Sequence, residues 1–153
     1  MTRMSRAAIV VMATAAMTTA TPSALATAPR AQAAQTINIT EHVDLHLVRK
    51  SGNTLYQSGT ATGTLPGNVS AIFKVEIARV SGTVTIYPRG GSLTISVNGT
   101  PRSAGSRPRF AGSMKVLRGT GRYRHASGRG TFSGSVNRRT WAARVDASAR
   151  LTY

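Results

Sequence analysis

The chain of 153 residues contains no cysteine. Disulfides cannot stabilise it, and both thiolate metal sites and a cysteine nucleophile are excluded. A serine nucleophile is not indicated either, because no G-x-S-x-G motif occurs. The length suits one domain with a core of ordinary size, so its stability must come from packing and backbone hydrogen bonds.

Acidic residues are nearly as scarce. The chain has 4 acidic and 20 basic side chains, a net charge of +16. From Arg102 onward, 12 basic residues stand against a single acidic one, Asp146. Such a charge attracts polyanions and anionic surfaces, which makes an anionic surface polymer a candidate partner. The alternative is a composition bias that serves solubility. No nucleic acid is expected, because no nucleic-acid-binding motif accompanies the charge.

The N-terminus has the three parts of a secretory signal peptide. Arg3 and Arg6 precede an uncharged stretch at 7–20, and A-x-A patterns follow at 24–26 and 31–33. The apolar stretch is short and rich in threonine for a membrane span, although an uncleaved anchor is the alternative. We predict a signal peptide and short linker at 1–33 and one domain at 34–153. The protein is then secreted, extracellular or in the cell envelope, and does not span a membrane.

Helical periodicity is nearly absent from the predicted domain. Apolar and polar residues alternate instead, with Gly, Ser, Asn and Pro between the runs, which is typical of β-strands. Asn98-Gly99 is also a turn signal. The pattern predicts about eight strands, at residues 36–49, 54–64, 69–79, 82–87, 92–97, 109–117, 130–136 and 140–153.

Many short strands with tight turns indicate an all-β sandwich or barrel. The first and last predicted strands are both long and apolar on one side, and pairing them with each other would remove two aggregation-prone edges. We therefore predict a closed eight-stranded antiparallel β-barrel. Its interior is filled by side chains or holds one small ligand.

One segment departs from plain alternation: it reads GTGRY at 119–123 and ASG at 126–128. A phosphate cradle is disfavoured here, because no helix follows the glycines. The segment resembles the GTG-x-[FY]…A-x-G signature of the allene oxide cyclase and dirigent-like β-barrel superfamily. SGTATGTLPG at 58–67 is similar to the early hairpin of its secreted bacterial members.

This resemblance implies a closed eight-stranded barrel with a central cavity. Such barrels include plant oxylipin cyclases, dirigent proteins that direct phenoxy-radical coupling, and bacterial polyketide cyclases, all of which orient a reactive apolar substrate. Many bacterial members have no known activity. We therefore expect a cavity for a small apolar or amphipathic ligand, or a non-catalytic role, without a cofactor. An isomerase or cyclase that templates its substrate is the alternative, and adhesion to an anionic surface is the third.

Glu41 is the candidate catalytic residue. In TINITEHVDLHLV, residues 36–48, it shares a face with five aliphatic residues. If that face points into the barrel, desolvation raises the pKa of Glu41 and makes it a candidate general acid. A position at the rim, a bulge that turns it outward, or a salt bridge are the alternatives.

The opposite face carries His42, Asp44 and His46 at alternate positions, about 6.5 Å apart, which is close enough for two of them to bind one metal ion. Because this face is opposite the apolar one, we expect it to be solvated and predict no metal site. Six aromatic residues are candidate ligand contacts, with a plain core role as the alternative: Tyr56, Phe73, Phe110, Tyr123, Trp141 and Tyr153.

Overall fold

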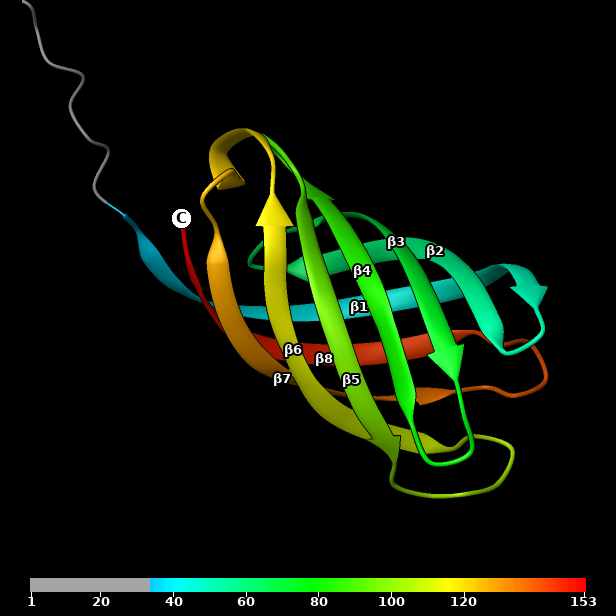
Figure 1. Ribbon diagram of the computed structural model, residues 1–153. Helices are drawn as coiled ribbons and strands as arrows, with labels where there is room; N and C mark the ends of the chain where they lie inside the picture. The colour runs from blue at the N-terminus through cyan, green and yellow to red at the C-terminus, as the bar shows by residue number, and fades with distance from the viewer. Residues whose placement is uncertain (1–33) are drawn as a thin grey trace, which may run out of the picture. The chain divides into compact units, whose positions relative to one another are not determined.

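The structure, a computed structural model, describes residues 34–153, so the predicted signal peptide and linker lie outside the described residues. The described chain forms strands and one short 3₁₀ helix (Figure 1). The elements are β1 (Thr36–Ser51), β2 (Thr54–Gly63), β3 (Gly67–Val75), β4 (Val80–Pro88), β5 (Leu93–Pro101), β6 (Arg109–Gly119), η1 (Gly121–Tyr123), β7 (Ser127–Val136) and β8 (Ala143–Thr152).

The eight strands form a closed antiparallel barrel in chain order, which confirms the predicted fold. β1 and β8 lie side by side, in cyan and red in Figure 1, and pair from Thr36↔Thr152 to Leu45↔Ala143. Beyond the strands, Gln35 and Tyr153 exchange two backbone hydrogen bonds of 2.8 and 2.9 Å. The long first and last strands thus cover each other's edges, as the sequence predicts.

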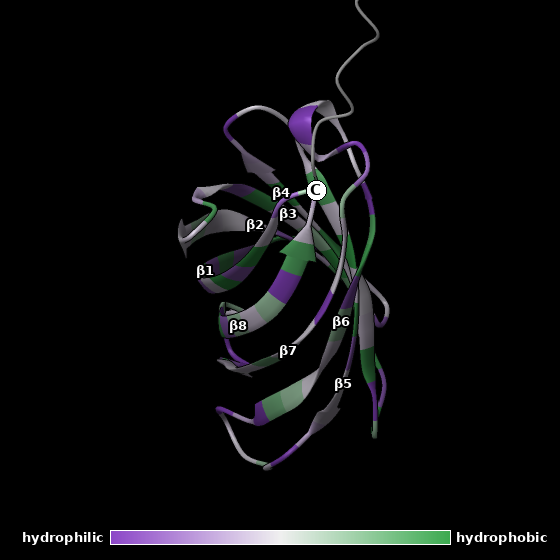
Figure 2. Ribbon diagram, turned by 90° about the vertical axis from the view of Figure 1, so that its left-hand side faces the viewer, coloured by the Kyte–Doolittle hydropathy of each residue, from purple (hydrophilic) through white to green (hydrophobic). Residues whose placement is uncertain are grey.

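The alternation of residue types determines which side chains face inward. On β1, Ile39, Glu41, Val43 and Leu45 are buried while the residues between them are exposed. The ribbon of β8 shows the same alternation of hydrophobic and hydrophilic segments in Figure 2. The core therefore lies inside the barrel, where all eight strands contribute aliphatic side chains and a few strands contribute aromatic rings.

The predicted turn at Asn98-Gly99 is wrong, because β5 continues to Pro101. Gly99 points inward, and a Cβ atom there would lie 3.0 Å from Cζ of Phe132. The glycine makes room for this ring inside the barrel rather than forming a turn. The predicted third strand is also too long, since β3 ends at Val75 and Ile77 lies fully exposed in the following loop.

The two ends of the barrel differ. One end carries the connections 52–53, 76–79, 102–108 and 137–142, and we call it the mouth. At the other end, the connection from β6 to β7 contains η1, whose Tyr123 is 2% exposed and belongs to the core. We call this the closed end. Within residues 34–153, there is no helix of the length and apolar character needed to cross a membrane.

Candidate functional site

A cavity of about 660 Å³ opens at the mouth. Its walls come from the inward faces of strands and from all four mouth connections, and most are apolar. The polar lining residues are few: Asn53, Gln57, Glu76, Arg109 and Arg138. The lining residues are Asn53, Leu55, Gln57, Phe73, Val75, Glu76, Ile77, Val80, Pro101, Pro108, Arg109, Phe110, Phe132, Val136, Arg138, Trp141, Ala143 and Val145.

A layer of aromatic rings forms the floor of this mouth cavity. Phe73, Phe110, Phe132 and Val145 line both the mouth cavity and a second, inner cavity of about 60 Å³. The rings of Phe110 and Phe132 lie 6.0 Å apart at an angle of 55°. The layer therefore separates a wide apolar space from a narrow one that admits only a thin group.

Glu41 lines the inner cavity, not the mouth cavity. It is the only polar residue among the side chains around that space, and it is 2% exposed. Its Oε1 accepts a hydrogen bond from the backbone N–H of Leu65, in the connection between β2 and β3. Its Oε2 has no hydrogen-bond partner among the described residues. The carboxyl group thus lies inside the barrel, toward the closed end.

Gly63 shapes the space around this carboxyl group. Its φ of +140° lies in a region that residues with a Cβ rarely adopt. A Cβ atom there would lie 2.1 Å from the carbonyl oxygen of Thr40 and 3.0 Å from Oε2 of Glu41. The glycine that ends β2 therefore allows the backbone and the carboxyl group to approach each other closely.

Burial raises the pKa of Glu41 above its ordinary value, because the charged form loses its hydration. The backbone N–H groups of Leu65 and Thr64, and the neighbouring His42, partly oppose this rise in pKa. The interior thus disfavours the charged form. When the carboxyl group is protonated, the oxygen that has no partner can donate a hydrogen bond.

Trp141 and Gln57 form an unusual arrangement at the mouth. Trp141 has a φ of +59°, a rare conformation for a bulky residue that costs about 1–3 kcal/mol. Gln57 is 3% exposed, and its Nε2 donates a hydrogen bond to the carbonyl oxygen of Trp141. Nζ of Lys50 lies 4.5 Å from the centre of the indole ring. These contacts hold the connection between β7 and β8 in place against the cavity.

The structure divides the six aromatic candidates into three groups. Phe73, Phe110 and Trp141 line the mouth cavity. Tyr123 and Tyr153 pack against each other at the closed end, with ring centres 5.1 Å apart, and line neither cavity.

Tyr56 is on the outer side of β2, where the guanidinium carbon of Arg49 lies 4.2 Å from its ring centre. Sequence alternation predicts this orientation, because Tyr56 falls between the inward residues Leu55 and Gln57.

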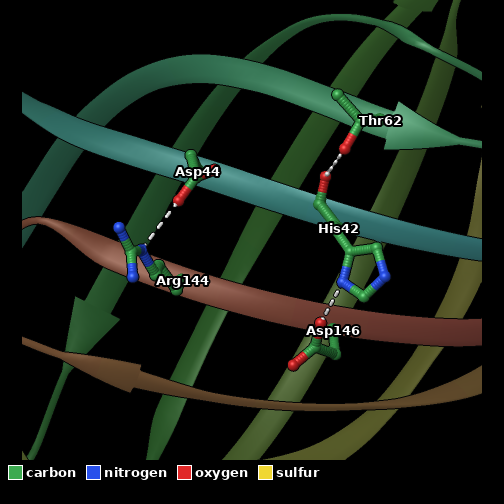
Figure 3. A network of polar contacts seen from close by, with 5 residues as sticks. All are labelled: His42, Asp44, Thr62, Arg144 and Asp146. Atoms are coloured by element: carbon green, nitrogen blue, oxygen red, sulfur yellow. Dashed lines mark hydrogen bonds and ion pairs between the residues drawn. The ribbon is translucent and has the colours of Figure 1, made fainter.

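His42, Asp44 and His46 lie on the outer face of β1, and each contacts a different partner. Figure 3 shows the contacts of His42 and Asp44. Nδ1 of His42 contacts Oδ1 of Asp146, and Oδ1 of Asp44 lies 3.2 Å from Nε of Arg144. His46 Nε2 and Ser58 Oγ are 2.9 Å apart. In the part of the chain that the structure describes, no group of three such side chains could hold a metal ion.

Gln57 and Phe132 are two site residues that the sequence interpretation missed. Both could have been found from alternation. Gln57 shares the inward phase of Leu55 and Ala61, and Phe132 points inward between the glycines of β7. The rim residue Arg138 could not have been found this way, because a connection places it at the mouth. Arg109 could not either, because it is the first residue of β6 and falls outside the inward phase of Phe110.

No protein-family model, curated protein or solved structure matches the chain.

Proposed function

We propose that the protein binds one small apolar or amphipathic ligand in the mouth cavity. The observation that carries this proposal is the size and lining of the cavity. Its volume of about 660 Å³ falls in the range of roughly 300–1,000 Å³ that is usual for ligand sites. Mostly apolar walls with a few polar groups are also usual for such sites.

The polar groups suggest how the ligand lies. The aromatic layer of Phe73, Phe110 and Phe132 gives an apolar contact at the floor, while Arg109 and Arg138 are at the rim. An amphipathic ligand then places its apolar part on the floor and its polar end at the rim. The strained backbone of Trp141 supports a ligand role for the mouth, because such strain is concentrated at functional sites.

We propose that this binding takes place outside the cell, on the strength of the signal-peptide pattern in the first 33 residues. We also propose a relationship to the allene oxide cyclase and dirigent-like barrels. Its support is the GTGRY segment at 119–123 together with the eight-stranded closed barrel. A barrel of that kind holds its ligand as proposed here.

Substituting Val145→Trp is expected to block the site. Val145 lines both cavities, so a larger ring would fill the floor of the mouth cavity. We expect the affinity for the uncharged fluorescent probe N-phenyl-1-naphthylamine to fall about tenfold or more, which equals about 1.4 kcal/mol. Probe fluorescence, titrated against wild type and variant, measures this. Ala143→Leu is a milder substitution in the same wall and should weaken binding less.

The matched control is Val48→Trp on the outer face of β1, where the side chain is largely exposed. It adds the same ring without entering the cavity and should leave probe affinity unchanged. Equal affinity in wild type and in both cavity variants, with all proteins folded by circular dichroism, would contradict binding in the mouth cavity.

A second candidate function is catalysis by templating, as in a cyclase or another isomerase. The observation that favours it is Glu41, whose raised pKa and unpartnered oxygen suit a hydrogen-bond donor or general acid. Because Glu41 lines the narrow inner cavity, a substrate would have to extend a thin group past the aromatic layer to reach it. Most of the substrate would remain in the mouth cavity.

Glu41→Leu tests whether a ligand reaches this carboxyl group. A long-chain 2-alkanone ends in a thin ketone that can accept the hydrogen bond, whereas an alkane of equal length cannot. We expect the ketone to lose about 1 kcal/mol of binding to the variant, the value of one hydrogen bond. Displacement of the fluorescent probe measures both ligands, and the alkane is the control. An equal change for both would show that the ligand does not contact Glu41, and catalysis by this residue would then be excluded.

A further inference from the structure

Three basic residues face one another across three neighbouring strands on the outside of the barrel. The strand register places Lys115 of β6 opposite Arg129 of β7, and Arg129 opposite Arg150 of β8. All three are exposed. Side chains directly opposite each other have Cβ atoms about 4.5–5.5 Å apart, so the three cations form one continuous row. We call it the cation row.

No carboxylate compensates the cation row. None of its members forms an ion pair within residues 34–153, whereas Arg144, further along β8, lies 3.2 Å from Asp44. Like charges in directly opposite positions destabilise a sheet. A bound anion would therefore offset the repulsion among the three cations of the row.

A groove of about 530 Å³ lies on the outside of the barrel next to the row. Two residues along each strand from the row, Ser113, Thr131 and Ser148 form a parallel row of hydroxyl groups, since the register pairs each with the next. The groove is lined by Thr40, Arg102, Ala111, Gly112, Ser113, Thr131, Phe132, Ser133, Asp146, Ala147 and Ser148.

The remaining charges at the groove favour an anion as well. Arg102 contributes a further exposed cation. Asp146 is the only acidic residue in the lining, and it already contacts His42 (Figure 3). The groove therefore combines hydroxyl donors with cations, and its one carboxylate is paired.

This chemistry matches phosphate groups. A guanidinium group presents two parallel N–H donors that fit two phosphate oxygens, and serine or threonine hydroxyls donate further hydrogen bonds. Proteins that bind single-stranded nucleic acid also use exposed aromatic rings, on which the bases stack. The only aromatic residue in the groove is Phe132, which is buried. The surface thus has donors for a phosphate backbone but no platform for bases.

We propose that the cation row and the adjacent groove bind a linear polymer of polyol phosphates, whose repeating unit is a phosphodiester without a base. The polymer lies across β6, β7 and β8, with successive phosphates at Lys115, Arg129 and Arg150. This site is separate from the mouth cavity, because no member of the cation row lines either inner space. The proposal therefore does not depend on a ligand in the barrel.

The test is the binding of a synthetic poly(glycerol phosphate), measured by calorimetry over a series of salt concentrations. The row variant combines Lys115→Ser, Arg129→Ser and Arg150→Ser. We expect its affinity at low salt to fall about 100-fold, and the slope of log affinity against log salt to decrease by about 2, for three lost phosphate contacts. A control variant combines Arg79→Ser, Arg89→Ser and Arg124→Ser. It removes the same charge from exposed positions outside the cation row. Its affinity for poly(glycerol phosphate) should fall only a few-fold.

Three results would overturn the proposal. The first is no binding by the wild type at low salt, and the second is an equal loss in the row and control variants, which would indicate attraction by net charge alone. The third is tighter binding of single-stranded DNA or of a sulfated polysaccharide than of poly(glycerol phosphate), which would indicate a different class of polymer. Folding of each variant is checked by thermal melting. The row variant should melt no lower than wild type, because a repulsion has been removed.

Discussion

Tyr123→Ala is expected to destabilise the barrel by about 3–5 kcal/mol, the usual cost of truncating a buried aromatic side chain to alanine. Tyr123 is 2% exposed, and its ring packs against Tyr153 where the connection between β6 and β7 covers the closed end. The close approach of Gly91 to the ring, where a Cβ atom would lie 3.2 Å from Cδ2, leaves little space unfilled. Since domains of this size have about 5–15 kcal/mol of stability in total, the effect is large. Urea unfolding followed by circular dichroism measures it.

Tyr87→Ala is the matched control, because Tyr87 lies on β4 with its side chain directed outward and is 52% exposed. We expect the free energy of unfolding of this variant to fall by about 1 kcal/mol or less, because residue types differ by about that much in their preference for β-strands. Tyr123→Phe removes only the hydroxyl group and keeps the ring, so this variant should retain most of the free energy of unfolding. If Tyr123→Ala and Tyr87→Ala were equally stable, the ring of Tyr123 would not be part of the core.

Glu41→Gln is expected to change how stability depends on pH. Burial raises the pKa of Glu41 in the folded state, so the folded protein keeps a proton that the unfolded chain releases above about pH 4.5. The wild type therefore loses stability as the pH rises from that value through the folded pKa. The loss is at most about 1.4 kcal/mol per pH unit for one proton. In Glu41→Gln this contribution disappears, and the amide oxygen can still accept the hydrogen bond from Leu65.

The measurement is the free energy of unfolding of both proteins between pH 4 and pH 9, because their difference isolates Glu41 from the other three acidic residues. As the pH rises, the free energy of unfolding of Glu41→Gln should increase relative to that of the wild type. The difference should become constant above the folded pKa of Glu41. Glu76→Gln is the control, since Glu76 is in an exposed connection and lies 3.1 Å from Lys74. Parallel curves for wild type and Glu41→Gln would contradict a raised pKa of Glu41 in the folded protein.

The alternation of apolar and polar residues along the sequence predicts most strands of the barrel. It assigns Ile39, Glu41, Val43 and Leu45 to one face of a long strand, and the structure buries all four. It fails at Gly99, because a glycine after asparagine is a turn signal locally, while its real constraint is the ring of Phe132 on a distant strand. Close approaches between strands leave no local trace in the sequence, so such a glycine is interpreted incorrectly.

The candidate site was predictable only in part. The sequence places Glu41 on the apolar face of its strand but leaves open a rim position, a bulge or a salt bridge, and the structure buries it inside the barrel. Its hydrogen bond to Leu65 depends on how the chain turns between β2 and β3. The separation of the interior into a wide mouth cavity and a narrow inner one depends on three phenylalanines from β3, β6 and β7. No spacing along the chain reveals that these rings meet, because the barrel brings them together.

The seam between β1 and β8 has a consequence for how the protein folds. Pairs such as Asn38↔Arg150 join residues more than 100 positions apart, so β1, which is synthesised before the other strands of residues 34–153, receives its second neighbour last. Until then, the long apolar face and free edge of β1 are exposed to other chains. Closing so large a loop makes folding slow, since the entropy is lost before the contacts form. The step that completes the barrel is therefore also the step during which aggregation competes most directly with folding.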